Sequence, residues 1–451
     1  MSCRAAFGPI VGDMRRCPPQ LGLILLLLLA FALRVGYCVA EGSLGRTPPR
    51  GYREYVETAQ RLLKHGTITS PLLTEDVDSA PSVILPPIYV LLVAGVYSLL
   101  GVETFWSTLT LHVINALATS MTAAVVFLVA RGLGGARAGW VAGLVTTLNP
   151  TLIGYTAFIW DTSLFACGVA LSVWISFRLT LRPSSWTAYL AFGFWLGGLA
   201  LLNPALTIAY PLLILWPLTA AKGWRFATLA RGVAAAVCGW LIALTPWTVR
   251  NYVHFGELLY VRGGFPVELW MGVSPEADTN PSAMFRANFP LQNAVAQRRV
   301  REIGEAAFLT ECGRLARAAI AADPWRWARL IARRTVDYWS GTVRTHAEPG
   351  GGWWPRSRGR AAVMLFLAAE FITGLLSGLV FRRWSRDPAW LAAIVVSFSI
   401  VYCLTHIQIR YRAPSEPILA IVLALLTTGV ARAKPSDSSA DGATTPPARR
   451  A

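Results

Sequence analysis

The sequence predicts an all-α integral membrane protein, and its composition and hydropathy pattern carry this prediction. Of the 451 residues, 54% are hydrophobic and 14% are charged, whereas soluble domains carry roughly 25% charged residues. Several apolar runs also reach the ~18 residues that indicate a transmembrane helix. We expect about ten transmembrane helices, juxtamembrane or re-entrant helices in the first outer loop, and a small, mostly helical outer segment.

The first apolar run, Leu21 to Ala40, follows Arg15 and Arg16. Its end at Cys38-Val39-Ala40 is also compatible with a cleaved signal peptide, but we favour a retained first span. Arg34 is then expected to snorkel near the outer end of that span. In either case the amino terminus is cytoplasmic and residues from Gly42 onward lie outside.

The stretch from Gly51 to Gly101 contains no clean membrane span. Apolar residues recur at helical spacing from Tyr52 to Leu63, and Gly66 follows as a stop signal. We expect this helix to lie flat on the bilayer, with Glu54 and the other charged residues turned toward water. The next apolar run, from Ile84 to Leu100, is predicted to begin at the Pro86-Pro87 break and to be re-entrant or juxtamembrane.

The later spans are oriented by basic residues in their short connections, which favour the cytoplasmic side. Counting Ile84 to Leu100 as a span would place the arginines after Ala130 and Phe177 outside. The expected spans after the first are Phe105–Ala130, Ala138–Tyr155, Thr162–Phe177, Trp186–Leu202, Pro204–Leu218, Gly232–Thr245, Ala361–Phe381, Trp390–Thr405 and Ile418–Val430.

The resulting organisation has both termini in the cytoplasm. The predicted parts are a tail (1–20), a first transmembrane helix (21–40), a first outer loop with juxtamembrane helices (41–104), a transmembrane bundle (105–248), an outer interfacial helical segment (249–360), C-terminal transmembrane helices (361–432) and a disordered tail (433–451). Within the outer segment, Val295–Ala322 is predicted to form one or two helices. Pro324–Ser340 combines tryptophan with arginine at a density typical of a helix in the headgroup region.

The charge and cysteine patterns exclude several classes of function. The net charge of +17 is spread over many loops, and no basic and aromatic cluster of the nucleic-acid-binding kind is present. Lipid phosphate, a lipid-linked substrate or the cytoplasmic leaflet is the simpler counterpart of this charge. The seven cysteines form no CxxC pair, so no disulfide framework or cysteine metal site is predicted.

Two acidic residues are candidates for catalysis at the outer face. Glu54 has no cation one helical turn ahead of it, whereas Glu57 has Arg61 as an i,i+4 partner. Asp161 follows Trp160 at the outer mouth, where one span ends and the next begins. An N-cap for the helix that starts at Thr162 also explains Asp161, and a cap is compatible with an active-site role.

Four basic or titratable residues are expected at the same surface: Arg250, His406, Arg410 and Arg412. Snorkelling at the membrane interface is one explanation for them. The other is a clamp for a lipid-linked phosphate or pyrophosphate, which suits the planar fork of arginine. No nucleotide-binding loop or hydrolase motif occurs in a suitable context, so an activated substrate is expected to arrive through the membrane.

Taken together, several motifs resemble those of polytopic C-type glycosyltransferases of the protein O-mannosyltransferase and aminoarabinose-transferase superfamily (glycosyltransferase family 39-like). The similarity runs from about Leu21 to Val430, and it rests on the order and spacing of the motifs, since each one alone is weak. The motifs are Glu54-Tyr55 with its helix, Leu85-Pro86-Pro87-Ile88-Tyr89, Trp160-Asp161-Thr162-Ser163, Leu202-Asn203-Pro204, Pro246-Trp247-Thr248-Val249-Arg250-Asn251-Tyr252 and Arg410-Tyr411-Arg412-Ala413-Pro414.

The resemblance implies transfer of a sugar from a polyprenyl-phosphate donor on the non-cytoplasmic face. An acid in the first outer loop of such enzymes activates the acceptor. It is commonly an aspartate at the position of Gly51, so Glu54 is the nearest substitute here. The second acid maps onto Asp161, and which of the two is the base stays open. Arg250, His406, Arg410 and Arg412 would bind the lipid phosphate.

We therefore expect an inverting membrane glycosyltransferase whose acceptor is a protein, a lipid or a glycan. Its partners would be the bilayer and the lipid-linked donor, without nucleic acid. It would lie in the bacterial inner (plasma) membrane with its active site on the periplasmic face. No cofactor is certain: a divalent metal is compatible with the sequence, but nothing indicates one. The alternative from another class is a non-enzymatic flippase or transporter of lipid-linked sugars.

Overall fold

A computed structural model gives the fold of the chain. It describes residues 19–49, 53–70, 72, 81–180, 185–220, 226–278, 281–340 and 385–428, together with isolated positions at 365–366, 369–370, 372–373 and 379. The expected span Ala361–Phe381 therefore lies outside the described residues apart from those positions. Residues 1–18 of the predicted N-terminal tail and the predicted tail 433–451 also lie outside them.

The described part is helical, and its one β contact is an isolated antiparallel bridge between Thr69 and Pro81. The all-α prediction is thus confirmed for this part of the chain. The elements are α2 (Pro19–Ala40), α3 (Glu54–His65), α4 (Pro87–Leu100), α5 (Phe105–Leu148), α6 (Pro150–Tyr155), α7 (Thr162–Leu179), α8 (Trp186–Leu202), the 3₁₀ helix η1 (Pro204–Ala209), α9 (Tyr210–Ala220), α10 (Phe226–Phe255), α11 (Phe265–Val273), α12 (Pro281–Asn288), α13 (Ala294–Ile303), α14 (Glu305–Ala322), α15 (Pro324–Ser340), α17 (Arg386–Leu404), α18 (Ile409–Arg412) and α19 (Glu416–Thr428).

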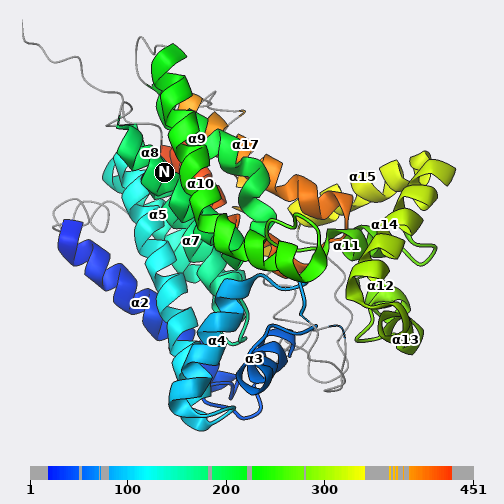
Figure 1. The fold of residues 1–451 in the computed structure, drawn as a ribbon. Helices are drawn as coiled ribbons and strands as arrows, with labels where there is room; N and C mark the ends of the chain where they lie inside the picture. The colour runs from blue at the N-terminus through cyan, green and yellow to red at the C-terminus, as the bar shows by residue number, and fades with distance from the viewer. Residues whose placement is uncertain are drawn as a thin grey trace, which may run out of the picture.

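The helices form an elongated bundle with a lobe on one side (Figure 1). The bundle contains α2, α5, α7 to α10, α17 and α19, and the lobe contains α11 to α15. Five described helices are long and apolar enough to cross a membrane, and four shorter apolar helices accompany them. The chain is an integral membrane protein, while the number of ten spans stays a prediction.

Helix α5 is a hairpin of two arms. Its 44 residues are interrupted at Gly135, where φ is +81° and ψ is −176°. The arms lie against each other, since the rings of Phe127 and Trp140 are 5.4 Å apart. Glycine tolerates this backbone conformation because it lacks a Cβ. The break falls between Arg131 and Arg137, where the sequence predicts a turn.

Helix α3 ends as predicted, but its surroundings differ from the expectation. Gly66 has a φ of +72° and its N–H bonds the carbonyl of Leu62, a left-handed helix C-cap. The prediction that the apolar face lies on the bilayer was wrong. Tyr55, Val56 and Ala59 are buried in the main core, and the Tyr55 ring meets that of Tyr89 on α4 at 4.9 Å. A hydrophobic face alone does not tell whether lipid or protein covers it.

Helix α4 begins at Pro87, with Pro86 in extended conformation before it, as the proline pair predicts. At 1.5 Å per residue its 14 residues span ~21 Å, which is less than the ~30 Å hydrocarbon core. Helix α19, which lies in an expected span, is as short with 13 residues, so the re-entrant or juxtamembrane placement of α4 stays a prediction.

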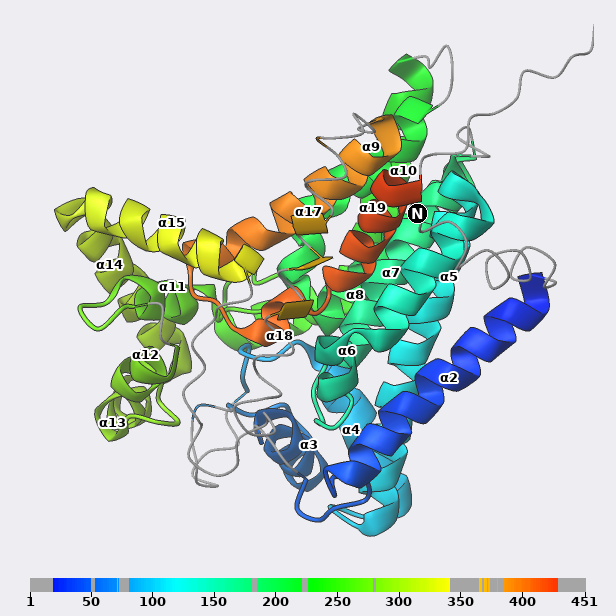
Figure 2. The ribbon, with the colours of Figure 1, turned by 180° about the vertical axis from the view of Figure 1, so that it is seen from behind.

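Arg34 on α2 does not snorkel, contrary to the expectation. Its side chain is fully buried and donates hydrogen bonds to Thr119 Oγ1 at 2.8 Å and to the carbonyl of Thr147 at 3.2 Å. Both acceptors lie on α5, which packs against the lower part of α2 (Figure 2). A buried guanidinium needs such acceptors, so Arg34 joins the two helices.

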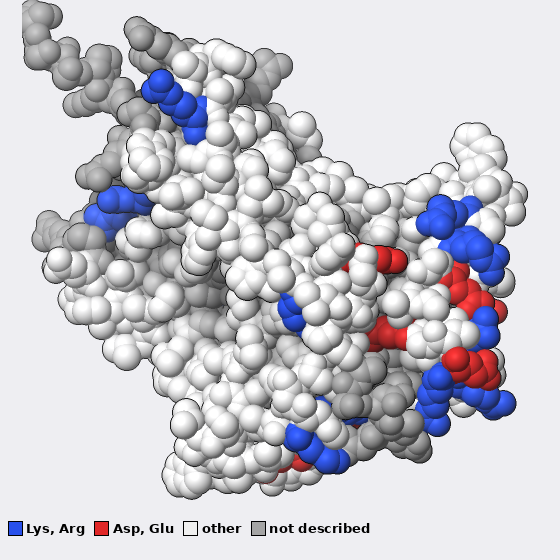
Figure 3. Space-filling view, in the orientation of Figure 1, with Lys and Arg blue, Asp and Glu red and all other residues white. Residues whose placement is uncertain are grey.

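Helix α10 continues through Pro246 to Phe255, so the predicted boundary between residues 248 and 249 falls inside a helix. The region Val295–Ala322 forms two helices separated at Gly304, whose φ is +81°. Helix α15 covers Pro324–Ser340 as predicted. Charged side chains gather over the α11–α15 lobe, whereas the bundle surface in this view is mostly uncharged (Figure 3). This contrast agrees with a bundle in lipid and a lobe in water.

Candidate active site

Helices α3 and α7 begin next to each other and bring two acidic residues into one site. The Tyr55 hydroxyl donates to Asp161 Oδ2 at 3.2 Å, and the Tyr55 ring meets the ring of Trp160 edge-on at 4.9 Å. Asn203, at the end of α8, donates to the same Oδ2 at 2.8 Å. The start of α3 is thereby fixed to the start of α7, and Glu54 stands beside this contact as the neighbour of Tyr55.

Asp161 does not act as a side-chain cap of α7. It occupies the N-cap position, but its carboxylate makes no capping hydrogen bond. The side chain is 2% exposed and is turned toward Tyr55 and Asn203 instead. Burial raises the pKa of Asp161, and the hydrogen bond from Asn203 opposes this rise. The carboxylate of Asp161 thus bonds Tyr55 and Asn203 in the site, while its backbone carbonyl accepts from the N–H of Phe165 at the start of α7.

Glu54 is turned into the protein, so the prediction of a water-facing carboxylate was wrong. The residue is half-buried, and its Oε2 is shielded from solvent and makes no hydrogen bond among the described residues. Burial raises the pKa of Glu54 from 4.5 to about 7, although Arg410 opposes the rise. Glu57, one turn on, lies at the surface and pairs with Arg53 at 3.0 Å.

Arg410 is close to two aromatic rings and to both acids. Its guanidinium is 4.6 Å from the ring of Trp160 and 5.2 Å from that of Tyr411. It also interacts electrostatically with both Glu54 and Asp161. Burial alone would lower the pKa of Arg410, but its contacts with Tyr411, Tyr155 and Glu54 raise it. The guanidinium is therefore a permanent positive charge at this site.

A chain of contacts extends the site from Tyr411 to α11. The Tyr411 hydroxyl is 3.0 Å from His406 Nε2, and His406 Nδ1 is 3.2 Å from Glu268 Oε2. Glu268 in turn pairs with Arg262 at 3.0 Å. Burial lowers the pKa of His406 to about 4, and Glu268 opposes this shift. His406 is accordingly neutral at pH 7 and carries no positive charge toward a phosphate.

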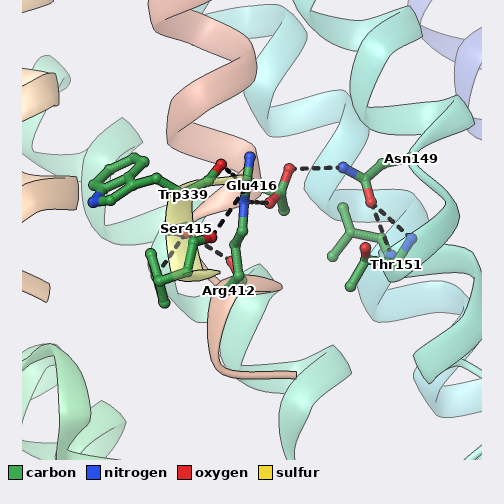
Figure 4. Close-up of polar contacts among 8 residues, drawn as sticks. Asn149, Thr151, Trp339, Arg412, Ser415 and Glu416 are labelled. Atoms are coloured by element: carbon green, nitrogen blue, oxygen red, sulfur yellow. Dashed lines mark hydrogen bonds and ion pairs between the residues drawn. The ribbon is translucent and has the colours of Figure 1, made fainter. Parts of the chain in front are cut away.

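Arg250 and Arg412 make their contacts outside this cluster. Arg250 donates to the carbonyl of Ser82 at 2.8 Å and lies 4.7 Å from the ring of Trp247, so it holds the segment that connects α3 to α4. Arg412 is 2% exposed and donates to Glu416 and to the carbonyl of Trp339 (Figure 4). Of the six predicted site residues, the structure thus brings together Glu54, Asp161, His406 and Arg410.

The second cluster ties three elements together. Glu416, at the start of α19, accepts from Arg412 and from Asn149 Nδ2, the latter at 3.0 Å (Figure 4). Asn149 Oδ1 accepts from the backbone N–H of Thr151 at 3.0 Å and so caps α6. Because a buried ion pair requires partners for its remaining polar atoms, this arrangement indicates a structural joint between α18, α19 and α6.

Glu268 and Arg262 were not predicted from the sequence. The role of Glu268 depends on His406, which lies far away in the chain. Its position as an isolated acid within the apolar run Phe265–Val273 was a signal that the sequence offered. Within the described residues, no group of three or more His, Cys, Asp or Glu side chains is arranged to hold a metal ion.

Comparison with solved structures gives distant matches along most of the chain. The oligosaccharyltransferase AglB from Archaeoglobus fulgidus, in complex with an inhibitory peptide and a dolichol-phosphate, has a TM-score of 0.53 at 15% identity and covers 90% of this chain and 50% of its own. The apo form of an Archaeoglobus fulgidus oligosaccharyltransferase has a TM-score of 0.51 at 14% identity, covering 89% and 49%. ArnT from Cupriavidus metallidurans bound to undecaprenyl phosphate has a TM-score of 0.39 at 15% identity, covering 94% and 78%.

No protein-family model and no curated protein matches the chain. The chain spans about half the length of the oligosaccharyltransferases that it matches in structure. The resemblance inferred from the sequence motifs is confirmed at the level of the fold: this chain has the GT-C fold of the oligosaccharyltransferases that it matches.

Proposed function

We propose that this protein is an inverting glycosyltransferase that moves a sugar from a polyprenyl-phosphate donor to an acceptor at the non-cytoplasmic face of the membrane. The observation that carries this proposal is the convergence of Glu54, Asp161 and Arg410 at one mouth of the bundle. The fold supports it, since an enzyme with the same fold has been solved with a dolichol-phosphate.

Glu54 is assigned as the base. Its Oε2 makes no hydrogen bond among the described residues, so a lone pair remains for the acceptor proton. A base with a pKa near 7 is well matched to neutral pH, because it is substantially ionised and still binds a proton strongly. Asp161 instead accepts two hydrogen bonds on Oδ2, so it holds Tyr55, and with it the start of α3, in place.

The proposed step is a single displacement. The acceptor oxygen or nitrogen forms a bond to the anomeric carbon while its proton moves to the Glu54 carboxylate. The bond between that carbon and the lipid phosphate oxygen breaks, and its electron pair stays on the phosphate. One displacement inverts the anomeric centre. Arg410, a permanent cation beside Trp160, would stabilise the negative charge that develops on the leaving phosphate.

The roles of the remaining candidates follow from their contacts. His406 is neutral at pH 7 and sits between Tyr411 and Glu268, so we assign it to orienting Tyr411 beside Arg410. Arg250 and Arg412 are assigned to holding the outer loop and the α18–α19 joint. Donor binding then depends on Arg410 among the four basic or titratable residues predicted from the sequence.

The test is a transfer assay with the purified full-length chain. Labelled undecaprenyl-phosphate sugars would be incubated with a panel of hydroxyl and amine acceptors, and product would be quantified by chromatography. Glu54→Gln is expected to lower the rate by about 10²-fold or more, the usual contribution of a general base. Glu57→Gln is the matched control, because Glu57 lies on the same helix and pairs with Arg53 at the surface.

The outcomes separate the enzyme from a carrier. A flippase would bind the donor and form no product with any acceptor. Product formation that is unaffected by Glu54→Gln would remove Glu54 as the base while keeping the transferase. Product formation lost equally in Glu57→Gln would show that the changes act on the helix and not on the chemistry.

A further inference from the structure

A hollow lies between α7 and α8 at the end of the bundle away from the candidate active site. Its volume is about 620 Å³, within the range of small-ligand pockets. At 1.5 Å per residue along α7, Arg178 stands ~26 Å from Asp161, so this hollow is separate from the site around Glu54. Its lining comes from Trp174, Ile175, Arg178 and Leu179 on α7 and from Ala188, Ala191 and Phe192 on α8.

The packing of α8 explains why a hollow remains. A Cβ at Gly193 would stand 1.8 Å from the carbonyl oxygen of Ala236, and one at Gly239 would stand 2.0 Å from that of Leu190. Helix α8 is thus drawn closely against α10 by its glycine face. On the side that faces α7, α8 contributes the small residues Ala188 and Ala191 to the hollow, and these leave the space between the two helices unfilled.

Helices α7 and α8 meet in their outer halves. The indole N–H of Trp195 donates to Ser172 Oγ at 2.9 Å, and a Cβ at Gly168 would stand 2.4 Å from Leu199 Cδ1. The residues that line the hollow all lie beyond this contact, toward the ends of the helices near Arg178. This contact lies between the hollow and the active-site end of the two helices.

Charge and polarity restrict what the hollow accepts. Among the described residues, seven line the hollow: six are apolar or aromatic, and the seventh is the cation Arg178. Arg178 is exposed, and its guanidinium lies 5.9 Å from the ring of Trp174. An occupant that fits has an apolar chain for the hollow and an anionic group for Arg178, whose guanidinium matches the geometry of phosphate oxygens.

We propose that this hollow, together with Arg178 at its edge, forms a groove that binds an anionic phospholipid, with an acyl chain in the hollow and the phosphate on Arg178. The site lies on the side of the membrane opposite Glu54. Basic residues mark the cytoplasmic side, where anionic lipids give the surface a negative potential. The proposal stands on the groove itself and does not depend on the glycosyltransferase activity.

The test is a lipid titration of the delipidated, detergent-purified full-length chain followed by native mass spectrometry. Phosphatidylglycerol and phosphatidylcholine would be compared, because both carry a phosphate and only the former is anionic overall. Arg178→Gln is expected to weaken phosphatidylglycerol binding by about fivefold, from a contribution of ~1 kcal/mol per basic residue near a charged membrane surface. Ala188→Phe, which fills the hollow, is expected to remove the bound lipid.

Arg131→Gln is the matched control. Arg131 is also a cation over an aromatic ring, 6.0 Å from that of Phe127, and it is not part of the lining. Its replacement should leave binding unchanged. Equal binding of both phospholipids, or wild-type binding by both Arg178→Gln and Ala188→Phe, would overturn the proposal. Displacement of phosphatidylglycerol by equimolar undecaprenyl phosphate would also overturn it, by assigning the groove to a polyprenyl chain.

Discussion

Glu54 and Asp161 have different chemical surroundings although they share one mouth of the bundle. Asp161 accepts hydrogen bonds from Tyr55 and Asn203, whereas Glu54 Oε2 accepts none among the described residues. Two carboxylates in unlike environments commonly take unlike roles in one reaction. This difference is the reason for assigning Glu54, and not Asp161, as the base, a choice that the sequence left open.

The first residue-scale prediction concerns the pH dependence of transfer. The ionised form of Glu54 is the active base, and burial raises its pKa to about 7. The value of kcat/KM for sugar transfer should therefore rise from pH 6 to pH 8, with an inflection near pH 7. The residual rate of Glu54→Gln should lack this limb, while Glu57→Gln should keep it. A limb that persists in Glu54→Gln would assign the titration to another group.

The same shift predicts how stability depends on pH. The pKa of Glu54 is raised from 4.5 to about 7 in the folded protein, so the folded state binds more protons than the unfolded state between these values. Its contribution to stability is complete below pH 4.5 and is lost as the pH rises through 7.

Glu54→Gln should consequently melt at a higher temperature than the wild type at pH 8, and at nearly the same temperature at pH 4.5. Thermal unfolding in one detergent, followed at both pH values, measures the difference. Glu57→Gln, whose wild-type side chain pairs with Arg53 at the surface, should show no such gain. A uniform offset of Glu54→Gln at both pH values would indicate a change in packing and not in ionisation.

The sequence could identify residue types at this site better than their neighbours. Glu54, Asp161 and Arg410 were predicted because each is charged at an expected membrane boundary. Their orientation depends on partners far away in the chain, such as Asn203 for Asp161. Glu268 was missed for the same reason, since its role depends on His406, which lies on a connection more than a hundred positions further along.

At the scale of elements, the spacing of apolar residues and the positions of proline and glycine predicted the helices well. The bounds of α8 and α15 agree with the expectation, and Pro87 and Gly66 start and end helices where they were predicted to. What periodicity could not predict was the neighbour of each face, as α3 shows by packing on α4. Nor did Pro246 end α10, because a membrane helix can accommodate an internal proline.

The contact between α8 and α10 gives an element-scale prediction. A Cβ at Gly193 would stand 1.8 Å from the backbone carbonyl of Ala236, whereas one at Gly198 on the same helix would meet nothing within 4 Å. Gly193→Ala must therefore push the helices apart, at a cost of ~1–3 kcal/mol typical of overpacking. Its apparent melting temperature should fall by several degrees, and that of Gly198→Ala should not. Equal melting of the two variants would contradict the close approach.

At the scale of the whole molecule, the proposed function depends on which side of the membrane the acids face. The predicted orientation of the spans places connections rich in basic residues, such as that between Arg131 and Arg137, on the cytoplasmic side. The break of α5 at Gly135 lies in this connection. The structure adds that the starts of α3 and α7 are joined by the hydrogen bond from Tyr55 to Asp161, and that α3, α12 and α13 lie toward the lower right of the bundle in Figure 1. Their common side can therefore be tested at exposed positions far from the chemistry.

Cysteine labelling gives the last prediction. Leu99 at the end of α4 is 83% exposed and Val295 on α13 is 72% exposed, while Phe226 at the start of α10 is 78% exposed. Helix α10 has 30 residues and is ~45 Å long, enough to place Phe226 across the bilayer from the lobe. An impermeant maleimide should label Leu99→Cys and Val295→Cys in intact cells, and Phe226→Cys only in inverted vesicles, above the wild-type background. Labelling of all three from one side would contradict the arrangement, and labelling of the first two from the cytoplasm would place Glu54 and Asp161 at the wrong face for a donor presented outside.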